Sequence, residues 1–256
     1  MEGYSLEGKT ALVTGVEHPL SQATAAILAE AGAAVAVCTG HGGAEYARRA
    51  EAAAVAVQQY QRQCRTYAIE VSSPTVVNTM VDELVREWGH LDILVNGLDL
   101  PFARPFLDST DSEWQRLLEH VLYGTLHCVR AAGQHMLRQH QGRIITYVSI
   151  LGERGMAHGA AYSTVQAALI QLTRSLAIEW GRGGVTVNAI GSGWAQGSAF
   201  LPTADDDLQR LLRYIPNHRL AEPDDLTALT VYLASDFGGN ITGQVMYIEG
   251  GVMSHP

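Results

Sequence analysis

Lysine is almost absent from this chain, because Lys9 is the only one and the other sixteen basic residues are arginines. Acidic residues outnumber basic ones and give a net charge of −9, which argues against nucleic acid as a partner. Lys9 precedes the first predicted strand, at the wrong end of a parallel sheet for active-site chemistry. A site that requires a lysine therefore cannot be completed from within this chain.

Cysteines and long apolar runs are also scarce. Cys38, Cys64 and Cys128 are widely spaced, which excludes a disulfide framework or a cysteine-rich metal site and is typical of a reducing compartment. No window approaches the roughly 18 apolar residues of a membrane span, and the first residues lack the basic and apolar regions of a signal peptide. We therefore expect a cytoplasmic protein without membrane partners.

Apolar runs of strand length alternate with longer helical segments along the whole chain. This order predicts one α/β domain over residues 1–256, a Rossmann-type doubly wound parallel sheet of about seven strands with helices on both faces. The predicted strands are 10–14, 34–38, 64–71, 91–96, 142–149, 185–190 and 244–248. The predicted helices are 21–31, 44–63, 74–88, 111–140, 162–179, 205–213 and 223–234.

Several short motifs follow these strands in a fixed order. They are Thr14-Gly15, Asn96, Ser149 with Tyr162 thirteen residues later, Val187-Asn188-Ala189-Ile190, and Ile241-Thr242-Gly243-Gln244 followed by Gly250-Gly251. The ordered set resembles the short-chain dehydrogenase/reductase family over nearly the whole chain. The resemblance implies hydride transfer with a nicotinamide cofactor, with Ser149 positioning the substrate oxygen and Tyr162 as general acid/base.

The partners that this family gives its tyrosine are missing. A lysine at i+4 shares one helix face with the tyrosine and lowers the phenol pKa from about 10, but Gln166 stands there. The family's proton-relay asparagine is replaced by Val121. We expect Tyr162 to keep a phenol pKa close to its ordinary value and to lose much of the roughly 10²–10⁴-fold of acid/base catalysis.

The cofactor loop departs from the family pattern as well. The pattern Thr-Gly-x-x-x-Gly-x-Gly reads Thr14-Gly15-Val16-Glu17-His18-Pro19-Leu20-Ser21. Pro19 lacks an N–H for phosphate, Glu17 adds negative charge, and Ser21 adds a side chain where helix and strand should pack closely. By resemblance the cofactor contacts are Gly15, Leu20, Glu70, Val71 and Asn96, and we expect them to be impaired.

Other positions that contact the cofactor in this family also depart from the family pattern. The second strand ends in Thr39-Gly40, without the acidic residue or arginine that selects the ribose. The family's Asp-Val pair is Glu70-Val71, its Asn-Asn-Ala-Gly turn is Asn96-Gly97-Leu98-Asp99, and its Pro-Gly is Ser192-Gly193. We expect no metal site and no tightly bound cofactor in this chain, with NAD(H) held by a partner subunit.

The main functional hypothesis is therefore a non-catalytic subunit that assembles with an active paralogous dehydrogenase, as a heterotetramer. The resemblance implies that the helices over 111–140 and 162–179 form the subunit contacts. The alternative is an active NAD(P)-dependent oxidoreductase that uses Ser149 and Tyr162 without lysine. A cofactor-free enzyme on the same fold ranks last. His18, His120 or His158 could replace the missing cation, although a lone histidine is more often structural.

Overall fold

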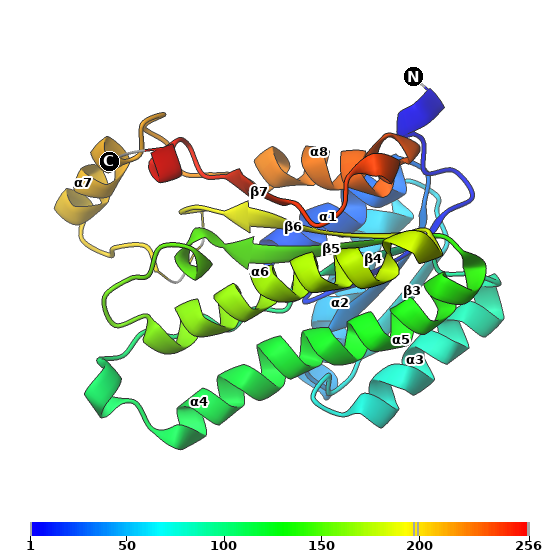
Figure 1. The fold of residues 1–256 in the computed structure, drawn as a ribbon, viewed down its shortest axis with the longest axis horizontal. Helices are drawn as coiled ribbons and strands as arrows, with labels where there is room; N and C mark the ends of the chain where they lie inside the picture. Colours follow the sequence, from blue (N-terminus) through cyan, green and yellow to red (C-terminus); the bar gives the residue numbers. More distant parts are fainter. Residues whose placement is uncertain (1, 197, 199, 255–256) are drawn as a thin grey trace.

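We analysed a computed structural model that describes residues 2–196, 198 and 200–254. Seven parallel strands form one sheet in the order β3-β2-β1-β4-β5-β6-β7, with helices on both faces (Figure 1). The strands are β1 Thr10–Thr14, β2 Ala34–Thr39, β3 Cys64–Ala68, β4 Ile93–Asn96, β5 Gly142–Ser149, β6 Val185–Ser192 and β7 Val245–Ile248. This confirms the predicted fold class.

The helices lie in two layers. One face of the sheet packs against α1 (Pro19–Glu30), α2 (Ala44–Gln58) and α8 (Pro223–Ala234). The other packs against α3 (Pro74–Trp88), α5 (Gly124–Gln139) and α6 (Ala160–Trp180). Two further α-helices are α4 (Asp111–Leu117) and α7 (Asp205–Tyr214). Both faces of the central strands are thus covered, which is why β1 is buried at every position.

Several predicted boundaries were wrong by two residues or more, among them those of β3, α2 and α1. Strand β3 ends at Ala68 rather than 71, because the chain turns there and the Val71 N–H donates to the Gly40 carbonyl at 3.3 Å. Helix α2 ends at Gln58 rather than 63, and Gln61 then adopts a left-handed φ of 57° as the chain reverses. Helix α1 begins at Pro19 rather than 21, since proline is favoured in the first turn.

The helix predicted over 111–140 does not keep α-helical backbone hydrogen bonding along its whole length. Residues Leu118–Tyr123 form a π-helix between α4 and α5, so each turn there contains an extra residue. The extra residue rotates the following side chains, and both His120 and Val121 are buried in this segment. Such irregular turns often occur at functional sites.

No helix among the described residues is long and apolar enough to cross a membrane.

Candidate active site

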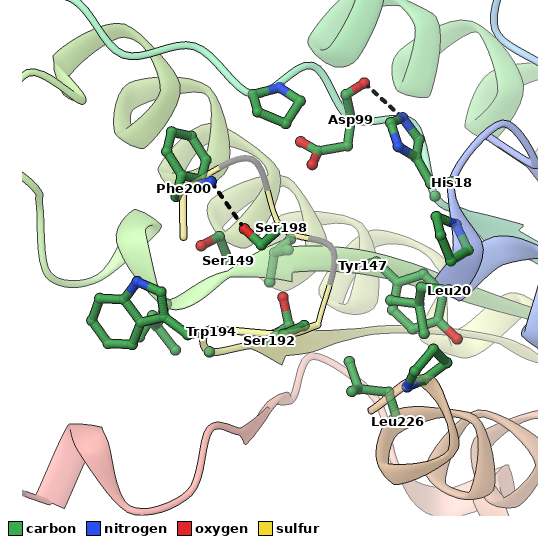
Figure 2. Close-up of a pocket in the computed structure, with 18 of the residues that line it drawn as sticks. His18, Leu20, Asp99, Tyr147, Ser149, Ser192, Trp194, Ser198, Phe200 and Leu226 are labelled. Atoms are coloured by element: carbon green, nitrogen blue, oxygen red, sulfur yellow. Dashed lines mark hydrogen bonds between the residues drawn. The ribbon is translucent and has the colours of Figure 1, made fainter. Parts of the chain in front are cut away.

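A cavity of about 400 Å³ opens beside the carboxyl ends of the central strands (Figure 2). Its walls come from the loops after β1 and β4, the end of β5, helix α6 and the segment after β6. Doubly wound sheets bind ligands where the strand order reverses, which here is between β1 and β4. The structure brings Ser149, Tyr162, Gln166 and Leu20 together around this cavity.

Gln166 is fixed by a specific hydrogen bond. Its side chain is 2% exposed, and its Oε1 accepts the backbone N–H of Ser149 at 3.0 Å. With Oε1 so occupied, the amide end of Gln166 donates toward Tyr162, a contact that lowers the phenol pKa. Gln166 thus supplies the tyrosine with a neutral donor where the family's lysine would supply a charge.

Asp99 is a site residue that the sequence reasoning missed. It stands at the glycine position of the turn after β4, and its side chain points into the cavity between His18 and Phe200 (Figure 2). Burial raises the carboxyl pKa, while His18 and Tyr162 act in the opposite direction. The Oδ1 atom is buried and has no hydrogen-bond partner among the described residues. The substitution of glycine by aspartate was the signal that could have revealed it.

The expectation that Tyr162 keeps its ordinary pKa was wrong. The phenol is 4% exposed and packs against Phe200, with 4.8 Å between ring centroids. Burial raises the pKa well above 10, and the Asp99 carboxylate raises it further, both as a negative charge and as a hydrogen-bond acceptor. Where the family has a cation, this chain therefore has a carboxyl group that acts on the phenol pKa in the opposite direction.

Val121 carries no polar group for a proton relay, and the three candidate histidines lie in different environments. Val121 is fully buried in the apolar cluster that also contains Tyr162. Burial and the neighbouring His41 lower the pKa of His120 to about 4, so this ring is neutral near pH 7. His18 lies at the cavity with its Nε2 3.1 Å from the Asp99 carbonyl oxygen, and His158 is exposed outside the cavity lining.

The first turn of α1 offers little to a phosphate. The N–H groups of Ser21 and Gln22 both donate to the His18 carbonyl, at 3.1 and 3.2 Å, and Pro19 has none. Leu20 contributes the one N–H of this turn that is left for an anion. Gly15 is required by packing, since a Cβ there would lie 2.1 Å from the Gly97 carbonyl oxygen at a φ of 73°.

Ser21 fits because residue 97 is glycine. A Cβ on Gly97 would lie 2.0 Å from the Ser21 Oγ, so the extra side chain on α1 and the missing one after β4 compensate each other. The helix and the strand therefore still pack closely, because Gly97 leaves room for the Ser21 side chain.

The adenosine end of the fold is filled by the chain's own side chains. Both carboxylate oxygens of Glu17 accept the Gly40 N–H, at 3.0 and 3.2 Å, at the end of β2. The Thr39 hydroxyl donates to the His41 carbonyl at 3.0 Å. The rings of His41 and His120 stack 4.2 Å apart beside Glu70. None of these residues lines the cavity.

Val71 and Asn96 are buried in structural roles. Val71 is fully buried, and its carbonyl oxygen lies 2.9 Å from His127 Nδ1. Asn96 is 1% exposed, with its Nδ2 donating to the Thr146 hydroxyl at 3.4 Å and its Oδ1 unpaired among the described residues. The cavity is thus large enough for a small ligand near Ser149, while Val71 and Asn96 are held by contacts within the chain.

Comparisons with known proteins agree with this architecture. The sequence profile of the family described as enoyl-(acyl carrier protein) reductase matches residues 15–253. The 3-oxoacyl-[acyl-carrier-protein] reductase FabG of Staphylococcus epidermidis is 32% identical, over 95% of this chain and 98% of its own length. Subunit BbsD of (2S)-[(R)-hydroxy(phenyl)methyl]succinyl-CoA dehydrogenase from Thauera aromatica is 30% identical, over 96% and 97%.

Solved structures show the same fold over almost the full length. A crystal structure described as a short-chain alcohol dehydrogenase from Sinorhizobium meliloti superimposes with a TM-score of 0.92 and 29% identity, covering 99% of this chain and 100% of that one. An NAD⁺-bound xylitol dehydrogenase gives a TM-score of 0.87 and 28% identity, covering 96% and 99%. The chain belongs to the short-chain dehydrogenase/reductase family of oxidoreductases.

Proposed function

We propose that this chain is a subunit of a heteromeric short-chain dehydrogenase that performs no hydride transfer itself and works beside an active paralogue. The observation that carries the proposal is the environment of Tyr162, where neutral Gln166 and the Asp99 carboxylate stand in place of a cation. A general acid/base must titrate near the working pH to be effective. A buried phenol beside a carboxylate is held far from that range.

The cofactor side supports the same proposal. Glu17, Pro19 and the stacked His41–His120 pair leave few backbone donors and little space for a dinucleotide. We therefore propose that any NAD(H) of the complex is bound by the partner subunit.

Exposed apolar side chains suggest where the partner would bind. Tyr123 is 48% exposed at the start of α5, and Ile178 is 85% exposed near the end of α6. The relative BbsD carries the word subunit in its name, so multi-subunit dehydrogenases occur among close relatives. We propose that the α4–α5 and α6 helices form the contact with an active paralogue in a heterotetramer.

The second candidate is an active NAD(P)-dependent oxidoreductase that acts on a hydroxyacyl or alcohol substrate through Ser149 and Tyr162. The comparisons favour this candidate over the first, because the relatives and neighbours named above carry the names of dehydrogenases or reductases. The cavity beside Ser149 is also large enough for a small substrate. The two candidates differ in whether Tyr162 of this chain takes part in turnover.

Cofactor titration of the purified chain separates them first. We expect calorimetry to detect no saturable binding of NADH or NADPH up to about millimolar concentration, against micromolar binding by a FabG-type relative as the positive control. Micromolar binding by this chain alone would support the second candidate.

The Tyr162→Phe variant then tests catalysis within the assembly. A search of the neighbouring genes for a paralogue with an intact Tyr-x-x-x-Lys motif identifies the partner to co-express. We expect the co-purified complex to keep its turnover when Tyr162 of this chain is replaced, and to lose it when the partner's tyrosine is. A drop of about 100-fold or more from Tyr162→Phe in this chain would refute the proposal.

A further inference from the structure

Three side chains with metal-binding groups meet beyond the carboxyl ends of β2 and β3, at the same edge of the sheet as the cavity but outside its lining. His41 follows β2 by two residues, Glu70 follows β3 by two residues, and His120 comes from the π-helix. Each offers one nitrogen or carboxylate oxygen, and the three atoms lie within 4.8 Å of one another. Because β2 and β3 are parallel neighbours, their carboxyl ends bring the first two residues to one edge of the sheet.

The local backbone is arranged to admit His120. A Cβ on Gly40 would lie 2.4 Å from the His120 Cε1, so glycine at that position is what lets the ring reach the end of β2. The π-helix supplies the second condition, because its extra residue turns His120 inward instead of toward solvent. Gly40 and the π-helix together thus allow the His120 imidazole to reach the end of β2.

One ring nitrogen of His120 has an unused lone pair or N–H. His120 is 4% exposed, and its Nδ1 is buried with no hydrogen-bond partner among the described residues. An unpaired buried polar atom is destabilising, and a bound ligand would remove that cost. The neighbouring His41 Nδ1 lies 3.4 Å from the Glu70 Oε2, a long contact, while the other carboxylate oxygen accepts the Ser72 hydroxyl at 3.1 Å. The last contact orients the carboxylate, as outer hydrogen bonds do around metal ligands.

We propose that His41, Glu70 and His120 form a binding site for a divalent transition-metal ion of the zinc type. Two imidazoles and one carboxylate are a set that Zn²⁺ accepts with a water as fourth ligand, whereas Mg²⁺ and Ca²⁺ prefer oxygen ligands alone. The site lies outside the cavity lining.

Binding requires a modest closure of the cluster. With metal–ligand distances of about 2.0–2.1 Å, tetrahedral ligand atoms lie about 3.3 Å apart, so the stacked rings must swing so that one nitrogen of each faces the ion. His41 can make this movement because Gly42 and Gly43 follow it, the latter at a φ of 102°. The bound ion would tie the ends of β2 and β3 to the α4–α5 connection.

Metal titration of the tag-free, full-length chain after chelator treatment tests the proposal. We expect calorimetry to give one Zn²⁺ per chain, Co²⁺ to show the visible absorption of a four-coordinate site, and Mg²⁺ not to compete. His41→Ala and Glu70→Gln should each weaken Zn²⁺ binding by at least about 100-fold, since even outer-shell changes cost 10–100-fold. Both replaced side chains are partly exposed, so both variants keep the packed core.

A matched control excludes binding to other histidines, of which the chain has ten in all. His135 forms a surface pair with Asp82, at 2.7 Å between Nε2 and Oδ1, and His135→Ala should leave Zn²⁺ binding unchanged. His120→Ala is measured together with its circular dichroism, to separate ligand loss from unfolding. The proposal is overturned if no Zn²⁺ binds, or if His41→Ala and Glu70→Gln bind it as tightly as the His135 control.

Discussion

Gln166→Lys restores the family's missing cation. The variant tests how much of the expected loss of activity is due to this one residue. The new ammonium would lie beside Tyr162 and near the Asp99 carboxylate. It would pair with Asp99 at least as well as it would activate the phenol, because Asp99 is buried and its Oδ1 lacks a partner among the described residues. We therefore expect the gain in activity to be small.

The structure also predicts a loss of stability in this variant. Lysine has no acceptor, so the Ser149 N–H loses the bond that it now donates to Gln166 at 3.0 Å. Leaving that group unpaired costs about 1–3 kcal/mol. Gln166→Met is the matched control, because it removes the same acceptor and adds no charge. The two variants should show similar losses in the free energy of unfolding, measured with urea.

Activity is measured as reduction of a 3-oxoacyl thioester, the substrate class in the name of the FabG relative, with NADH and with NADPH. We expect Gln166→Lys to raise the rate by less than about 10-fold, out of the 10²–10⁴-fold that acid/base catalysis can supply, because the loop after β1 is unchanged. A gain of 100-fold or more from this one substitution would refute the reasoning. It would show that the loop binds cofactor and that only the charge was missing.

Two further predictions concern stability. Gly97→Ala should destabilise the fold by about 1–3 kcal/mol through overpacking against Ser21; Ser21→Gly in the same chain should recover at least about 0.5 kcal/mol of it, and strictly additive losses would contradict the compensation. Asp225→Asn removes the pair with Arg219 at 2.6 and 2.7 Å and the cap on the Glu222 N–H. These contacts lower the pKa of Asp225 to about 2, so their stabilisation is complete above about pH 4 and is lost as the pH falls toward 2. The variant should cost about 1 kcal/mol at pH 7 after solvent screening, and a cost that does not shrink at pH 3 would contradict this.

The sequence predicted secondary structure correctly where an element depends on a local pattern of polar and apolar residues. The strand over Thr10–Thr14 and the helix over Pro74–Trp88 were predicted with the bounds that the structure has. The π-helix at Leu118–Tyr123 was not, because an extra residue in a turn leaves the polar and apolar pattern of a helix nearly unchanged. The segment buries His120 and Val121 against residues that are distant in the sequence, which a local pattern does not reveal.

The sequence alone determined which chemical groups are present. With Lys9 as the only lysine and Gln166 four residues after Tyr162, no structure could place the family's catalytic lysine beside the phenol. The fold class was determined in the same way, because alternating strands and helices can bury their apolar faces in few arrangements.

Tertiary structure decided what those groups do to one another. Asp99 and Tyr162 lie far apart in sequence, and only the fold brings the carboxylate to the phenol and raises the phenol pKa. The same holds for Ser21 with Gly97 and for His41 with His120, whose effects depend on distances of a few ångströms across separate elements. Electrostatic and packing interactions fall off steeply with distance, so residue identities alone could not predict them.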